Sequence, residues 1–132
     1  MQANHLHLIV EAQSAEALSS GMRGLAVRLA RRVNALLFRR GRFWADRWHG
    51  AELRSPRQVR NALVYVLQNH AKHSRQRGAA LDPLSSAPEF GGFAGTHSAG
   101  PRAGPFVEAR TWLLRVGWKR HGLIRRDEVP MQ

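Results

Sequence analysis

The sequence predicts an α+β domain, because segments with the period of a strand and segments with the period of a helix follow one another along its first half. Residues 5–11 alternate in character, as a strand does, and residues 18–36 repeat at helical spacing. In the predicted strand, one face carries Leu6, Leu8 and Val10, and the other carries His5, His7 and Ile9.

The predicted helices have clear beginnings. The first begins near Ser14, and its apolar stripe runs from Leu18 to Leu36. Residues 42–54 follow as a turn and a second strand. A second helix begins at Ser55 and Pro56, an N-cap residue followed by proline at the first helical position, and continues to about residue 73.

The second half of the chain is richer in glycine and proline. Residues 78–105 are expected to be a linker between a domain over residues 1–77 and a C-terminal segment over residues 106–132. Within that last segment, residues 108–118 predict a short helix, and a basic tail follows it.

Composition points to a polyanionic partner. Lys and Arg number 21 against 9 Asp and Glu, a formal net charge of +12 on 132 residues. Almost all the basic residues are arginine, which binds phosphate in a forked geometry and favours nucleic acid over a lipid surface. The chain has no cysteine, no apolar run of membrane-spanning length and no signal-peptide pattern, so we expect a cytoplasmic protein without a membrane partner.

The residues most suggestive of chemistry are His5, His7 and Tyr65. Two histidines two apart on a strand point the same way and can reach one cation. Tyr65 is the chain's one tyrosine, and Asn69 follows it one helical turn later. A phenol can attack a phosphodiester beside a divalent metal, either Mg²⁺ or Mn²⁺, with the Asn69 amide as a further ligand. The same residues are also typical of an ordinary surface strand and an ordinary core tyrosine.

Four segments in order resemble the single-tyrosine HUH transposases, the REP-associated enzymes and their relatives. Residues 4–11 (NHLHLIVE) resemble the histidine signature, and residues 22–40 the helix after it. Residues 42–49 resemble the next strand, and residues 61–70 (NALVYVLQNH) the helix of the nucleophile. The similarity covers about residues 3–73, and residues 109–114 resemble one bacterial branch more weakly.

The resemblance implies a partial ferredoxin-like domain, with a small antiparallel sheet, packed helices and a loop-rich C-terminal tail. Relatives carry a strand, a helix and a strand before the histidine motif, which here begins at residue 5, so a truncated domain is expected. It also implies that His5, His7 and Asn69 bind the metal and that Tyr65 nicks and joins single-stranded or hairpin DNA in transposition. Some relatives are homodimers, and others are monomers.

DNA would be held mainly through phosphates. The expected contacts are Arg28, Arg31, Arg32, Arg39, Arg40, Arg57, Arg60 and Lys72. Exposed aromatic residues among Phe43, Trp44 and Trp48 could stack on bases, although core packing is the alternative. Two other functions remain open: a catalytically inactive nucleic-acid-binding remnant of such a transposase, and a small basic interaction protein whose His-x-His is incidental.

Overall fold

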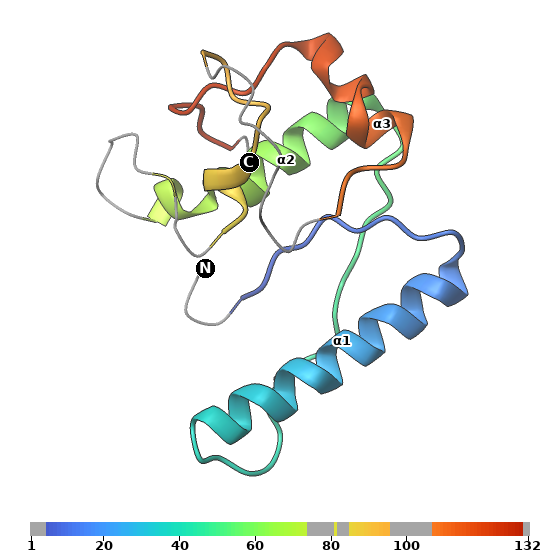
Figure 1. The fold of residues 1–132 in the computed structure, drawn as a ribbon, viewed down its shortest axis with the longest axis vertical. Coiled ribbons are helices and arrows are strands. Elements are labelled where there is room, and N and C mark those ends of the chain that lie inside the picture. The colour runs from blue at the N-terminus through green and yellow to red at the C-terminus, as the bar shows by residue number, and fades with distance from the viewer. Residues whose placement is uncertain (1–4, 74–80, 82–84, 96–106, 131–132) are drawn as a thin grey trace. The chain divides into compact units, whose positions relative to one another are not determined.

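The computed structural model describes residues 5–73, 81, 85–95 and 107–130. Their helical elements, drawn in Figure 1, are α1 (Ala15–Leu36), α2 (Pro56–His73), the 3₁₀ turn η1 (Ala87–Glu89), α3 (Trp112–Arg115) and the 3₁₀ turn η2 (Gly117–His121). The chain divides into two compact units. One comprises Met1–Val10 and Leu53–Gln132, and the other Glu11–Glu52.

The predicted antiparallel sheet, and with it the partial ferredoxin-like fold, is wrong. In the described residues β-pairing is confined to isolated bridges, such as the parallel one between Phe93 and Ile124. Residues 6–10 are extended without being part of a strand, and residues 42–54 contain neither strand nor helix. A strand is stabilised by partners on its edges, and residues 42–54 lack the regular alternation that would make them such a partner.

The larger unit is organised around α2. One side of this helix supplies Val59, Leu63, Val64 and Leu67 to the core, each at most 8% exposed. This unit consists of two stretches of chain, Met1–Val10 and Leu53–Gln132. Ile9 from the first stretch and Leu53 from the second both pack against the same core. The helix therefore has a buried face and a face left for solvent.

The start of α2 is fixed by a reciprocal capping arrangement. The Ser55 hydroxyl accepts a hydrogen bond from the Gln58 backbone N–H at 3.2 Å. The Gln58 side-chain oxygen in turn accepts the N–H groups of Ser55 at 3.1 Å and Arg54 at 2.8 Å. These bonds satisfy donors that a helix leaves unpaired at its first turn, so the helix begins where the sequence predicts.

A glycine-rich segment contributes to the same core, although the sequence predicts a linker there. Phe93, 1% exposed, lies within residues 91–95, and Ala87 is fully buried. The Ala94 N–H donates to the Ile124 carbonyl at 2.8 Å, which joins this segment to the chain after η2. Gly92 permits the glycine-rich segment to lie close to Trp118, because a Cβ at position 92 would lie 2.6 Å from the Trp118 ring.

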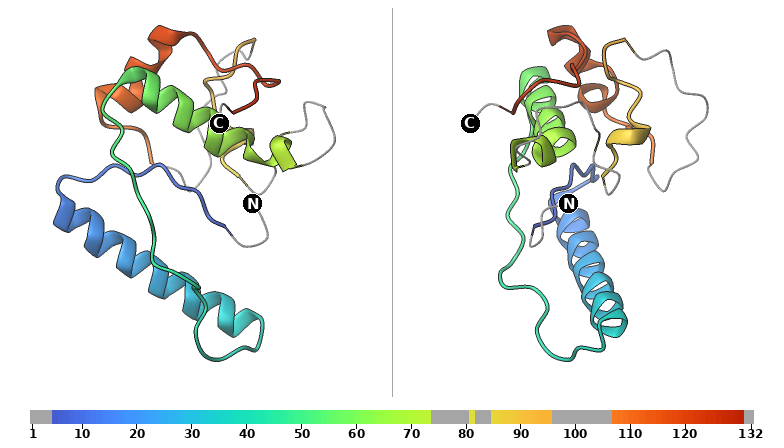
Figure 2. Two further views of the ribbon diagram at one scale, coloured as in Figure 1. Left: turned by 180° about the vertical axis from the view of Figure 1, so that it is seen from behind. Right: turned by 90° about the vertical axis from the view of Figure 1, so that its left-hand side faces the viewer.

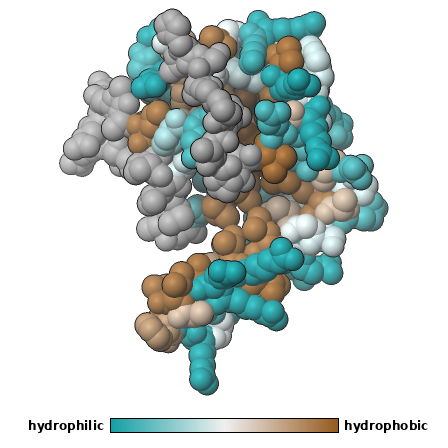
Figure 3. Space-filling view, in the orientation of Figure 1, coloured by the Kyte–Doolittle hydropathy of each residue, from teal (hydrophilic) through white to brown (hydrophobic). Residues whose placement is uncertain are grey.

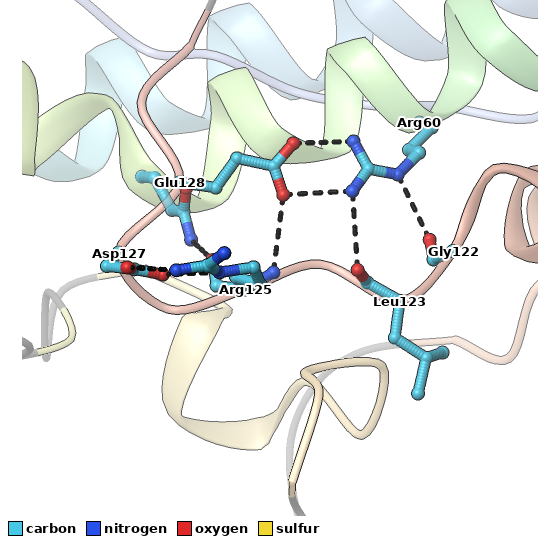
Figure 4. Close-up of polar contacts among 7 residues, drawn as sticks. Arg60, Gly122, Leu123, Arg125, Asp127 and Glu128 are labelled. Carbon is cyan, nitrogen blue, oxygen red and sulfur yellow. Dashed lines mark hydrogen bonds and ion pairs between the residues drawn. The ribbon is translucent and has the colours of Figure 1, made fainter.

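The segment after η2 is tied to α2 by Arg60. Its guanidinium forms an ion pair with Glu128 at 2.5 Å and also donates to the carbonyls of Gly122 and Leu123. Figure 4 shows this cluster, and the views of Figure 2 show the same segment beside α2. Both charged side chains are largely buried, at 15% and 26% exposure, so the contact helps to close the unit.

The smaller unit consists of α1 and the segment that folds back on it. Ser14 caps the helix by accepting the Ala17 N–H at 3.1 Å, and the Trp44 indole donates to the Ala26 carbonyl at 2.9 Å. No residue of α1 is buried. Its apolar stripe is only half covered, and apolar side chains show on the surface of this helix in Figure 3.

Within the described part of the chain, no helix combines the length and apolar character needed to cross a membrane.

Candidate active site

The structure brings His7 and Tyr65 together. Their ring centroids are 5.0 Å apart and their planes meet at 85°, an edge-to-face contact. Tyr65 lies in α2 but on the side away from the core, and it is 37% exposed while its neighbour Val64 is buried. Two residues separated by most of the first half of the sequence thus meet at the surface of one compact unit.

His5 lies beside His7, as the spacing of the motif predicts. The two imidazole rings are nearly parallel, with centroids 6.1 Å apart and planes 9° from one another. The alternation expected for residues 5–10 is seen in exposure only from residue 6, because His5 is exposed like Leu6. Leu6, Leu8 and Val10 are 44–50% exposed, whereas His7 and Ile9 are partly covered.

The environment of His7 favours its neutral form. Partial burial lowers the pKa of His7, and the neighbouring His5 lowers that pKa further because two positive charges would repel one another. A neutral imidazole keeps a nitrogen lone pair, which is the form that binds a metal ion.

The donor set of this cluster fits a divalent cation in part. His5 and His7 offer two imidazoles from one face of the segment. The described residues contain no group of three His, Cys, Asp or Glu side chains able to hold a metal ion, so the remaining ligands would have to be oxygens of another kind. Asn69 lies in α2 one turn after Tyr65, and its side chain is outside the described residues.

The predicted phosphate contacts fall in different places. Arg28, Arg31 and Arg32 are exposed on α1, and Arg57 is exposed near the start of α2. Arg39 and Arg40 are exposed just after α1. Lys72 is in the last turn of α2, with its side chain outside the described residues.

Arg60 does not lie where a phosphate could reach it easily. Its side chain is 15% exposed and engaged by Glu128 and two carbonyls. The reason is its position on α2, one residue after the buried Val59 and therefore at the border of the core face. We assign Arg60 to the stability of the fold and not to a DNA surface.

The aromatic residues around position 44 mainly pack within their own unit. The Trp44 indole N–H bonds to the α1 backbone, and Phe43 lies edge-to-face on Trp44 with centroids 4.8 Å apart. Trp48 is 45% exposed, and its ring would lie 2.9 Å from a Cβ on Gly50. Trp44 thus packs against α1 and Phe43 against Trp44, and both are half-buried without being part of a buried core in the described residues.

One aromatic contact was missed by sequence reasoning. The guanidinium of Arg120 lies over the Trp112 ring, 4.8 Å from its centroid. The two residues are eight apart, a spacing that no single helix would suggest. The helix α3 ends at Arg115 and η2 begins at Gly117, which lies between the two residues. The lack of a side chain at Gly117 is the signal that points to this approach.

Compared with known proteins, the chain matches no protein-family model, no curated protein and no solved structure.

Proposed function

We propose that this chain binds single-stranded DNA and nicks and rejoins it through Tyr65, with His5 and His7 holding a divalent cation. The observation that supports this most is the contact between the one tyrosine of the chain and the second histidine of the His-x-His motif. It supports the proposal because a phenol at an exposed position, in contact with His7 and with His5 adjoining, is the combination that would serve DNA cleavage by a tyrosine beside a metal ion.

In the proposed reaction, the Tyr65 oxygen attacks the phosphorus of a phosphodiester. A bond forms between that oxygen and the phosphorus, and the bond from phosphorus to the 3′-oxygen breaks. The phenolic proton passes to solvent, and the departing oxygen takes a proton to become a free 3′-hydroxyl. Attack by a 3′-hydroxyl on the phosphotyrosine is the reverse step, and it joins two DNA ends without an external energy source.

The chain's residues have separate tasks in this scheme. His5 and His7 would bind the cation, with Asn69, water and the DNA phosphate as further ligands. A bound Mg²⁺ or Mn²⁺ polarises the scissile phosphate and neutralises charge that develops on it. His7 also contacts the Tyr65 ring, which restricts the orientations open to the nucleophile.

Binding would come chiefly from arginine. Arg28, Arg31 and Arg32 share one side of α1 because they are three and four residues apart. Within the described residues none of them forms an ion pair with a carboxylate, so their charges are free to contact phosphates. Such contacts give salt-dependent affinity without sequence preference. We place this DNA-directed activity in the cytoplasm.

The test is a covalent-adduct assay. The purified chain is incubated with Mg²⁺ or Mn²⁺ and a labelled hairpin-bearing single strand, and adducts are separated on a denaturing gel. We expect an adduct with the native chain and none with Tyr65→Phe, which keeps the ring contact with His7 and should still bind DNA. Salt-sensitive binding with no adduct under either metal would instead identify an inactive DNA-binding remnant.

A further inference from the structure

We propose that Trp112, Arg115, Lys119 and Arg120 form a second contact for single-stranded DNA, separate from the Tyr65 site. We call these four residues the C-terminal patch. They lie on α3 and η2, the segment that follows residue 111 and continues to His121. The proposal rests on the proposed function only in taking single-stranded DNA as the ligand.

The aromatic part of the patch is held in place by the backbone. A Cβ on Gly117 would lie 2.6 Å from the six-membered ring of Trp112, closer than real side chains approach. The indole is therefore seated directly against the Gly117 backbone. It nevertheless remains 49% exposed, with the Arg120 guanidinium above it. An unpaired base can stack on the exposed part of this indole together with the guanidinium plane that lies over it.

The charged part of the patch is available to a phosphate chain. Arg115, Lys119 and Arg120 are all exposed. No carboxylate of the described residues pairs with any of them, in contrast to Arg125, which Asp127 binds at 2.6 Å. Cations beside an exposed indole match the two features of a nucleotide, a flat base and a charged phosphate.

A membrane surface is the main competitor for a patch of tryptophan and basic residues, and the structure argues against it. A membrane-bound helix needs a long apolar face to insert between lipids. Here α3 spans only four residues, and its two leucines, Leu113 and Leu114, pack against the protein core. Apart from the indole, Val116, 46% exposed, is the one large apolar side chain exposed between residues 112 and 121, so the segment has several cations but no long apolar face to insert.

The test measures binding in a form that cannot react. The full chain carrying Tyr65→Phe is titrated in EDTA into a fluorescent oligo(dT) of about 16 nucleotides, the upper end of known site sizes, at several salt concentrations. Four variants are compared: Trp112→Leu, Trp112→Phe, Arg120→Gln and the control Arg125→Gln. The control removes the same charge from a residue that is already paired with Asp127.

We expect Trp112→Leu to weaken binding about tenfold, as the loss of one stacked base does. Arg120→Gln should lower the slope of log affinity against log salt by about 0.7, the value for one phosphate on a single strand. Arg125→Gln should leave both quantities near those of the parent. Trp112→Phe keeps an aromatic face and should recover most of the affinity, which separates stacking from misfolding.

Equal effects of Arg120→Gln and Arg125→Gln, or an unchanged affinity for Trp112→Leu, would overturn the proposal. So would loss of binding to phosphatidylserine-containing vesicles in Trp112→Leu with oligonucleotide binding intact, because that result assigns the patch to lipid. The assay contains no metal and forms no adduct. Failure of the C-terminal patch is therefore distinguishable from failure of the Tyr65 reaction.

Discussion

His7 and Tyr65 lie edge to face, with ring centroids 5.0 Å apart, and this contact joins the opening segment of the chain to the exposed side of α2. His5 extends the cluster, since its ring is nearly parallel to that of His7. Under the proposed function, this arrangement would place the nucleophile next to the metal ligands, with no β-sheet among the described residues to carry them.

Removing either histidine of the cluster should weaken metal binding. We expect His5→Ala and His7→Ala each to lower the affinity for Mn²⁺ by at least about tenfold, the smallest effect usual for loss of a group that merely supports a metal ligand. Electron paramagnetic resonance of free Mn²⁺, with the oligonucleotide present, measures this affinity. His121→Ala, which removes a histidine of the same unit from η2, is the control. Equal Mn²⁺ affinities of His5→Ala, His7→Ala and the control His121→Ala would show that the His-x-His motif is incidental.

Breaking the Arg60 ion pair should destabilise the larger unit. Glu128→Gln leaves the guanidinium largely buried without its carboxylate, and we expect a loss of about 1–3 kcal/mol in the free energy of unfolding. Urea titration followed by circular dichroism measures the change. Asp127→Asn is the control, because its ion pair with Arg125 is solvent-exposed and should matter little. A Glu128→Gln variant as stable as its parent contradicts the structural role given to Arg60.

The same pair predicts a dependence of stability on pH. The Glu128 carboxylate accepts hydrogen bonds from Arg60, and these lower the pKa of Glu128 from its ordinary value of 4.5. A carboxylate with a lowered folded-state pKa stabilises the protein fully above its ordinary pKa, and this contribution is lost as pH falls through the lowered value. Stability should therefore decline below about pH 4.5, and less steeply in Glu128→Gln. Parallel declines in the two proteins, measured by thermal unfolding, would rule out this contribution.

A structural feature can be predicted from the sequence when it depends on residues that are close together in the chain. The start of α2 is predicted correctly because Ser55 and Gln58 cap it with their own side chains. The sheet is predicted wrongly because strand pairing is a property of distant segments, and the extended residues 6–10 have the alternation of a strand without a strand partner in the described chain.

The candidate site shows the same difference between contacts of neighbouring residues and contacts of distant segments. The proximity of His5 and His7 follows from their spacing, and the position of Tyr65 within a helix follows from the apolar period around it. The pairing of Arg60 with Glu128 is beyond such reasoning, because it depends on how the segment after η2 returns to α2. The burial of Phe93 in a glycine-rich stretch is likewise decided by tertiary contacts that local composition does not encode.

A glycine in that stretch provides a further prediction. A Cβ at Gly92 would lie 2.5 Å from the Phe90 ring and 2.6 Å from the Trp118 ring. We expect Gly92→Ala to cost about 1–3 kcal/mol of stability, the usual effect of overfilling a packed core. Gly24→Ala in α1 meets no atom within 4 Å and should instead be neutral or stabilising, since alanine favours helix. Near-ultraviolet circular dichroism of the tryptophans during urea unfolding reports both effects.

The most direct test of the central claim is to locate the DNA on the protein. The chain is reacted with a single-stranded hairpin and Mn²⁺, digested with a protease and a nuclease, and the modified peptide is sequenced by mass spectrometry. We predict a nucleotide attached through its 5′-phosphate to Tyr65, and no such peptide in His7→Ala. A nucleotide found on a serine or threonine, or a Tyr65 peptide that is always unmodified although the DNA is cut, would contradict the assignment of the nucleophile.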